Sequence, residues 1–178
     1  MEKLKWLVIN YNLPTEPSRH RVAVWRALKK LGAVNIQQSM WLLIFSEDNY
    51  TALKKISRDI EEFSGEALLM ESSFCHELHE KRILSLFNDI RNDEYKELIS
   101  ECSKYLKELE KEIKIEKFTF AELEEEEAEL DKLIQWYGRI QARDIFHASG
   151  QSSAEVILEE IRKAFDNYSE LVYRHNQK

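Results

Sequence analysis

Residues 6–45, WLVINYNLPTEPSRHRVAVWRALKKLGAVNIQQSMWLLIF, decide how this chain folds. The stretch opens with a short apolar run typical of a buried strand, expected over about residues 5–11. Pro14 and Pro17 end that strand and start a helix near residues 15–18. We expect this helix to run to Leu31, with Gly32 as its left-handed C-terminal cap. The apolar and polar pattern of residues 35–45 then predicts two short strands with a kink or tight turn near residues 38–39.

The next thirty or so residues complete a recognisable order of elements. Ser46 and the residues after it cap a helix over about 48–64, in which apolar side chains recur every three or four positions. Gly65 ends this helix, and residues 66–73 form a last strand. The order βαββαβ predicts an α+β, ferredoxin-like domain, with an antiparallel four-stranded sheet and both helices on one face.

Beyond the sheet domain the sequence predicts helices alone. They are expected over about residues 77–115, 120–146 and 153–175, with capping boxes at Thr119–Glu122 and Ser152–Glu155. Each has one apolar stripe to bury, and the stripes of the first and third helices have heptad spacing. We therefore expect an all-helical C-terminal hairpin or three-helix bundle, packed on the sheet domain or projecting from it. The predicted domains are residues 1–74 and 75–178.

Composition limits the classes of function. The chain has 178 residues and a net charge of −7, yet residues 1–70 carry ten Lys/Arg against eight Asp/Glu while residues 71–178 carry sixteen against twenty-five. Nucleic-acid contact would thus need a local basic patch. No apolar run approaches the roughly 20 residues of a membrane span, and the start does not resemble a signal peptide. Two cysteines suit a reducing compartment. We expect a cytoplasmic protein with no membrane partner.

One such basic patch lies in the first helix. Residues 18–31 contain five Arg/Lys, one His and no acid. On a helical wheel Arg19, Arg26 and Lys30 fall within about 40° of one another, opposite the apolar stripe. The pattern fits an ordinary solvated face, and it also fits a surface that contacts DNA or another anion. The candidate contact residues are Arg19, His20, Arg21, Arg26, Lys29 and Lys30.

Three other clusters have two interpretations each. Cys75 and His79 share a helix face as zinc ligands would, but no second pair completes a site, so we expect no metal and no cofactor. The glutamate run of residues 122–131 is a solvated face or a docking surface for the basic helix or a basic partner. Arg139 and Arg143 either pair with acids of a neighbouring helix or form a clamp for an oxyanion. No motif of catalysis is present, so we expect no enzyme and no catalytic residues.

Several segments together resemble the N-terminal domain of the ChrB chromate-resistance family. They are residues 6–26, Leu31–Trp41, Asp93–Tyr95 with Glu101–Cys102, Lys117–Glu124 and Ile140–Asp144, and the likeness covers about residues 5–174. The resemblance implies a cytoplasmic regulator that responds to chromate and controls expression of a chromate efflux pump. Larger members carry a C-terminal domain that we expect this chain to lack, so a separate partner protein would take its place.

The first domain is more distantly similar to the central domain of PaaX-type repressors and to the ferredoxin-like subunit of CRISPR adaptation complexes. Both likenesses imply the same fold and a homodimer. The CRISPR subunit has a metal-binding acid at the end of its first strand, where this chain has Asn10 or Asn12. The amide is a much poorer Mg²⁺ ligand, so the resemblance does not imply nuclease activity.

Four hypotheses follow. The first is a dimeric regulator of transcription that contacts DNA or another protein through the basic helix. The second is a sensor that binds chromate directly, with Arg19, Arg139 and Arg143 as the clamp. The third is a reductase that uses Cys75 or Cys102, and the fourth is a purely structural dimeric interaction module.

Overall fold

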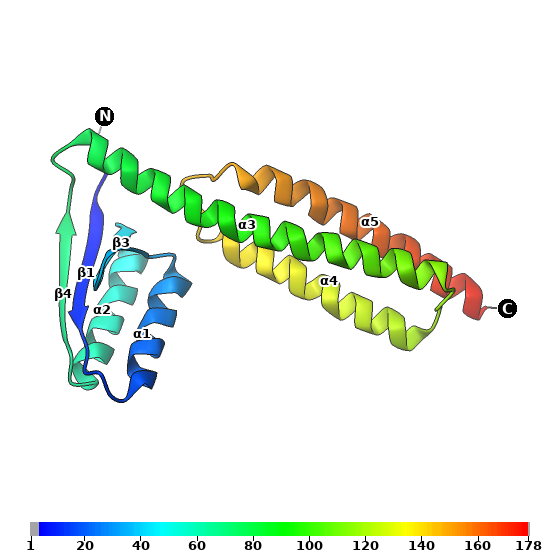
Figure 1. Ribbon diagram of the computed structural model, residues 1–178, viewed down its shortest axis with the longest axis horizontal. Helices are drawn as coiled ribbons and strands as arrows, with labels where there is room; N and C mark the ends of the chain where they lie inside the picture. The colour runs from blue at the N-terminus through cyan, green and yellow to red at the C-terminus, as the bar shows by residue number, and fades with distance from the viewer. Residues whose placement is uncertain (1–3, 178) are drawn as a thin grey trace. The chain divides into compact units, whose positions relative to one another are not determined.

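The computed structural model describes residues 4–177, which form a sheet unit and a helical unit (Figure 1). The elements of the sheet unit are β1 (Trp6–Asn12), α1 (Ser18–Leu31), β2 (Val34–Gln37), β3 (Met40–Ile44), α2 (Glu47–Glu62) and β4 (Glu66–Ser72). They are followed by α3 (Glu77–Lys114), α4 (Phe120–Gln141) and α5 (Gly150–Asn176). The two compact units divide between Leu86 and Phe87, inside α3, whereas the sequence placed the domain boundary at 74/75. Residues 1–3 and 178 of the predicted domains lie outside the described residues.

The sheet has the strand order β2-β3-β1-β4, and every neighbouring pair is antiparallel. Trp6 of β1 lies opposite Ile44 of β3 on one side and Ser72 of β4 on the other. Figure 1 shows α1 and α2 next to each other on one side of the strands. This is the predicted α+β, ferredoxin-like arrangement, and it is confirmed.

Alternation along the central strands builds the core of this unit. Leu7 and Ile9 of β1 and Leu43 of β3 point to one face of the sheet, because successive strand side chains point in opposite directions. There they pack with Leu28 of α1 and Ile60 of α2, all 1% exposed or less. The sheet thus fixes α1 by its apolar stripe and leaves the opposite side of that helix outward.

Left-handed turns mark the ends of several elements. Gly32 caps α1 at φ 81°, as the sequence predicts, and Gln38 makes the tight turn between β2 and β3 at φ 38°. After α2, however, it is Ser64 that takes the left-handed conformation, at φ 61°. Gly65 has another reason to be a glycine, because a Cβ there would lie 2.4 Å from the carbonyl oxygen of Asn12.

The helical unit is a three-helix bundle, which decides between the two arrangements that the sequence allowed. Figure 1 shows α3, α4 and α5 running alongside one another. Its core takes residues from all three helices, among them Tyr95 and Leu98 of α3, Leu133 of α4, and Ile161 and Tyr168 of α5. The three- and four-residue steps of these positions confirm the heptad stripes.

One predicted cap is confirmed and one is wrong. Thr119 Oγ1 accepts a hydrogen bond from the backbone N–H of Glu122 (3.2 Å) at the start of α4. Ser152 does not cap α5, which begins two residues earlier, and its hydroxyl donates to the Ser149 carbonyl oxygen. The cap comes instead from α3, since Asn92 Oδ1 accepts from the Gly150 N–H at 2.8 Å.

One further difference concerns the length of a helix. The predicted helix 120–146 ends at Gln141, because residues 142–149 turn the chain into α5. No helix within residues 4–177 is both long and apolar enough to cross a bilayer.

Candidate functional site

The outward side of α1 presents the cationic residues predicted from the helical wheel. Arg19, Arg26 and Lys30 are all exposed, and so is Arg21, which the wheel places nearer the apolar stripe. Within residues 4–177, no cation of α1 forms an ion pair with a carboxylate. The positive charge of this face is therefore not neutralised by the described part of the chain.

Two of the six candidate residues are held by neighbouring rings. His20 stacks on Phe63, with ring centroids 4.0 Å apart, and its Nε2 accepts a long hydrogen bond of 3.5 Å from Arg19. Lys29 lies with its ammonium 5.9 Å from the centre of the Trp25 ring. These contacts anchor His20 to the end of α2, so the outward cations are chiefly Arg19, Arg26 and Lys30.

Apolar side chains accompany these cations. Trp25 is 49% exposed and Val22 is 41% exposed, although both belong to a helix with a well-buried opposite stripe. An exposed tryptophan beside cations is a common feature of surfaces that bind a partner. We call Arg19, Val22, Trp25, Arg26 and Lys30 the α1 surface.

The arginines of the predicted oxyanion clamp have different environments. Arg139 is exposed on α4. Arg143 follows the end of α4 and donates from Nη2 to Glu94 Oε2 of α3 at 3.2 Å. The same carboxylate oxygen lies 3.3 Å from Nε of Arg91. Glu94 therefore bridges two guanidinium groups, and Arg91 is the arginine that shares this carboxylate with Arg143.

Arg91 is buried to an unusual degree for a cation, with 3% of its surface exposed. Its Nε and Nη1 atoms, and Nε of Arg143, are buried without an acceptor in hydrogen-bond geometry among the described residues. Burial lowers the pKa of Arg91; the carboxylate of Glu94 opposes this shift and the charge of Arg143 adds to it. The pair thus has more hydrogen-bond donors than the chain supplies acceptors.

Asp144 fixes the turn that carries Arg143. It is 7% exposed and accepts hydrogen bonds from the Tyr95 hydroxyl (3.0 Å) and the backbone N–H of Ala148 (2.9 Å). Burial, followed by the hydrogen bond to Asp144, raises the pKa of Tyr95. Arg143 is therefore positioned by a buried network that joins α3 to the turn before α5.

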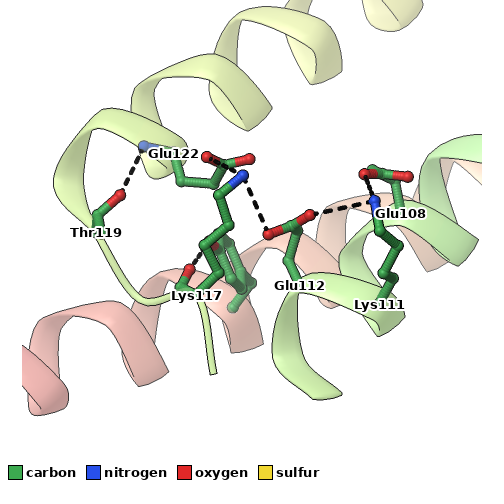
Figure 2. Close-up of polar contacts among 7 residues, drawn as sticks. Glu108, Lys111, Glu112, Lys117, Thr119 and Glu122 are labelled. Carbon is green, nitrogen blue, oxygen red and sulfur yellow. Dashed lines mark hydrogen bonds and ion pairs between the residues drawn. The ribbon is translucent and has the colours of Figure 1, made fainter. Parts of the chain in front are cut away.

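Two glutamates of the helical unit are also buried, Glu112 of α3 and Glu126 of α4. Glu112 has cationic partners, since Lys117 lies 3.4 Å from one of its oxygens and Lys111 lies 3.6 Å from the other. Figure 2 shows Lys117 reaching between Glu112 and Glu122. The predicted solvated glutamate run therefore includes one residue, Glu126, that is not at the surface.

Sequence reasoning missed Arg91, Glu112 and Glu126, although a signal was present. All three occupy positions of the apolar stripes. Arg91 lies four residues before Tyr95, Glu112 lies three after Leu109, and Glu126 lies four before Leu130. A charge at such a position faces the core of the bundle, which marks it for a specific interaction.

The two cysteines are free thiols, Cys75 exposed and Cys102 buried. Burial raises the pKa of Cys102 to about 11, so the reactive thiolate form is scarce at neutral pH. Within the part of the chain that the structure describes, no three His, Cys, Asp or Glu side chains gather into a cluster that could hold a metal ion.

The fold and the α1 surface define a ferredoxin-like α+β domain with an attached three-helix bundle and one unpaired basic helix. A sequence model of the family described as "Protein ChrB, N-terminal" matches residues 21–178, and the chain belongs to this family. It is similar to Protein ChrB of Cupriavidus metallidurans strain CH34, with 25% identity over 165 residues that cover 90% of this chain and 46% of that protein. The chain thus spans about half the length of this curated relative. No solved structure matches the chain.

Proposed function

We propose that this chain acts in chromate resistance as a regulatory domain, and that the α1 surface contacts DNA. Family membership supports the link to chromate resistance. The observation that carries the DNA contact is the set of exposed cations on α1 that no described carboxylate neutralises. In a chain of net charge −7 such an arrangement concentrates positive potential on one helix.

Phosphate contact suits these side chains. Arg19, Arg26 and Lys30 recur at intervals of seven and four residues along one side of the helix. Guanidinium groups can fork onto phosphate oxygens, and each neutralised phosphate releases condensed counterions. Trp25 and Val22 add apolar contact beside the phosphates. A partner protein with an acidic surface is the alternative occupant of the same face.

We infer that the functional unit is a dimer. Among the strands of residues 4–177, β4 lies at the edge of the sheet and pairs only with β1, which leaves one side of its backbone open. Leu68 and Met70 of this strand are 64% and 44% exposed. An edge strand with exposed apolar side chains favours association with a second copy, and two copies would present two α1 surfaces to one DNA duplex.

Charge reversal on α1 tests the proposal against a matched control. In the R26E/K30E variant, DNA affinity is expected to fall. The slope of log K against log salt is expected to become less negative by about 2, because two phosphate contacts are lost. The control is K55E/R58E on α2, which makes the same change of charge at two exposed positions. It is expected to retain most of the wild-type slope. Equal slopes for both variants would show that only net charge matters and that α1 is not the contact surface.

Arg91 and Arg143 favour a second candidate function, the binding of an oxyanion such as chromate. The favouring observation is the buried guanidinium of Arg91, whose Nε and Nη1 atoms have no acceptor in hydrogen-bond geometry within residues 4–177. A tetrahedral dianion would accept from both arginines, with Glu94 displaced toward solvent, where it is already one-quarter exposed.

Calorimetry with chromate and with sulfate tests this candidate. Binding heat is expected for the wild-type chain and for R139M, because Arg139 is exposed on α4. R91M is expected to abolish the heat. An absence of heat with both anions in the wild-type chain would reject the oxyanion site, and unchanged binding by R91M would place it elsewhere.

A further inference from the structure

A cleft lies between α3 and α4, with a volume of about 470 Å³. Its lining includes six glutamates (Glu101, Glu108, Glu122, Glu125, Glu126 and Glu129) and the aromatic side chain of Tyr105. Acidic residues at a surface are in themselves ordinary. The ion pairs around the cleft, however, distinguish Glu125 and Glu126 from the other four glutamates.

Four of the glutamates have a lysine close by. Glu101, Glu108, Glu122 and Glu129 each lie within 2.6–2.8 Å of a lysine ammonium of the same chain. Such exposed pairs add little stability, but they neutralise the rim. Among the described residues, Glu125 and Glu126 are therefore the two glutamates of the lining that form no ion pair.

Glu126 is the unusual member. It is only 6% exposed, and its carboxylate forms no hydrogen bond and no ion pair with any residue that the structure describes. The other buried glutamate, Glu112, has two lysines near it (Figure 2). A buried carboxyl group without a partner is costly to keep ionised, because it loses hydration and gains no compensating contact.

The same environment affects its protonation. Burial, and then the nearby carboxylates of Glu122, Glu108, Glu112 and Glu125, raises the pKa of Glu126 to about 7. The charged and titratable groups of the cleft and its surroundings on α3 are Glu101, Lys104, Tyr105, Glu108, Lys111 and Glu112. On α4 they are Glu122, Glu125, Glu129 and Lys132, and Tyr168 of α5 also interacts with Glu126. Lys117, in the loop before α4, pairs with Glu112 and Glu122.

We propose that this cleft binds an organic cation of the alkylammonium class, with Glu126 as its main anionic contact and Glu125 at the mouth. An ammonium group would supply the ion-pair partner that Glu126 lacks, and its methylene chain could lie against Tyr105. The described residues hold no cluster suited to a metal ion, which favours an organic cation. The source is a free aliphatic diamine, or a lysine on the α1 surface of a second copy, and the test separates the two. The inference does not depend on DNA or oxyanion binding.

Binding of such a cation is linked to a proton. The cation stabilises the ionised form of Glu126, so binding releases a proton wherever that group is protonated beforehand. Affinity is expected to rise about tenfold between pH 6 and pH 8, since the ionised fraction of a group with a pKa near 7 changes by about that factor. Above pH 8 the affinity should level off.

The first experiment titrates the full chain with cadaverine by calorimetry at pH 6 and pH 8 in low salt. One site per chain is expected, tighter at pH 8. E126Q should weaken binding at least tenfold and remove the pH dependence. The matched control is E127Q, which removes the same charge from the next residue, an exposed one outside the lining of the cleft. It should bind as wild type does. Circular dichroism verifies that E126Q is folded, and the carboxyl ¹³C shift of Glu126 should move on addition of cadaverine.

The second experiment identifies the source. Sedimentation is measured for wild type, E126Q and K30E in low salt, without added amine. Self-association that both substitutions abolish, and that cadaverine reverses, would assign the cleft to α1 of a second copy. Cadaverine binding without such association would assign it to a free amine. The proposal is overturned if neither is seen, if E126Q and E127Q behave alike, or if Mg²⁺ competes as strongly as the amine.

Discussion

The carboxyl group of Glu126 makes stability depend on pH in a direction opposite to that of most carboxylates. Its pKa is raised in the folded protein to about 7, from an ordinary value of 4.5, so the folded state holds the proton more tightly than the unfolded state. Stability should therefore decrease as pH rises from about 4.5 to about 7. Glu126→Gln removes this loss and should add at most about 3 kcal/mol at pH 8, since solvent in the cleft screens part of the effect, but little at pH 4.5.

Chemical denaturation of wild type, E126Q and E127Q at the two pH values measures this effect. E127Q provides the reference for loss of an exposed glutamate. A stability gain for E126Q that is the same at pH 4.5 and pH 8 would contradict the raised pKa, because the effect would then come from packing.

Gly65 is required for space. Its added Cβ would lie 2.4 Å from the carbonyl oxygen of Asn12 and 2.9 Å from Cγ2 of Ile60, so G65A must displace backbone at the end of β1. We expect a loss of about 2 kcal/mol or more in the free energy of unfolding. G138A is the control, because no atom lies within 4 Å of its added Cβ on α4, and alanine there should add about 0.5–1 kcal/mol. Thermal unfolding of the two variants distinguishes them, and equal effects would refute the close approach.

In α3, the charged side chain of Arg91 lies on the apolar stripe of the helix, and we expect it to serve a purpose other than stability. Arg91 lies on the stripe of Tyr95 and Leu98, and it shares Glu94 with Arg143. In R91M, Glu94 keeps its pairing with Arg143. We therefore expect R91M to be as stable as wild type or up to about 2 kcal/mol more stable.

Equilibrium unfolding checks this against L98A, a truncation at a fully buried position of the same helix, which should lose about 2–5 kcal/mol. A comparable loss in R91M would show that the arginine is a structural requirement. Greater stability together with lost oxyanion binding would show that it is kept for function.

The elements also show what the sequence could predict. Periodicity and glycine chemistry act locally, so the order of strands and helices along the chain, the Gly32 cap and the heptad stripes of the bundle were predictable. The cap of α5 was not, because it comes from Asn92, 58 residues before Gly150. In the same way the wheel predicted the cations of α1, while the stacking of His20 on Phe63 depends on tertiary packing. The Arg91–Arg143 pair and the buried Glu126 could be predicted only in part, since the stripe shows a charge facing the core but not its partner.

Across the whole chain, charge is divided between the two units. The sheet unit contains the cations of α1, and the helical unit contains the acidic cleft and most of the excess of carboxylates. The carboxylates of the helical unit should repel DNA phosphates at long range. Binding of DNA by α1 should therefore depend on short-range contacts. A partner that binds the cleft and adds positive charge would reduce this repulsion.

The most direct test of the proposed function is a titration of the purified chain against its own upstream DNA and against scrambled DNA, followed by gel shift and fluorescence anisotropy. It is run at two salt concentrations, with and without chromate. We expect sequence-specific binding that weakens steeply with salt, is lost in R26E/K30E and is released by chromate. Absence of binding to either DNA at both salt concentrations would contradict it, and would assign the α1 surface to contact with another protein.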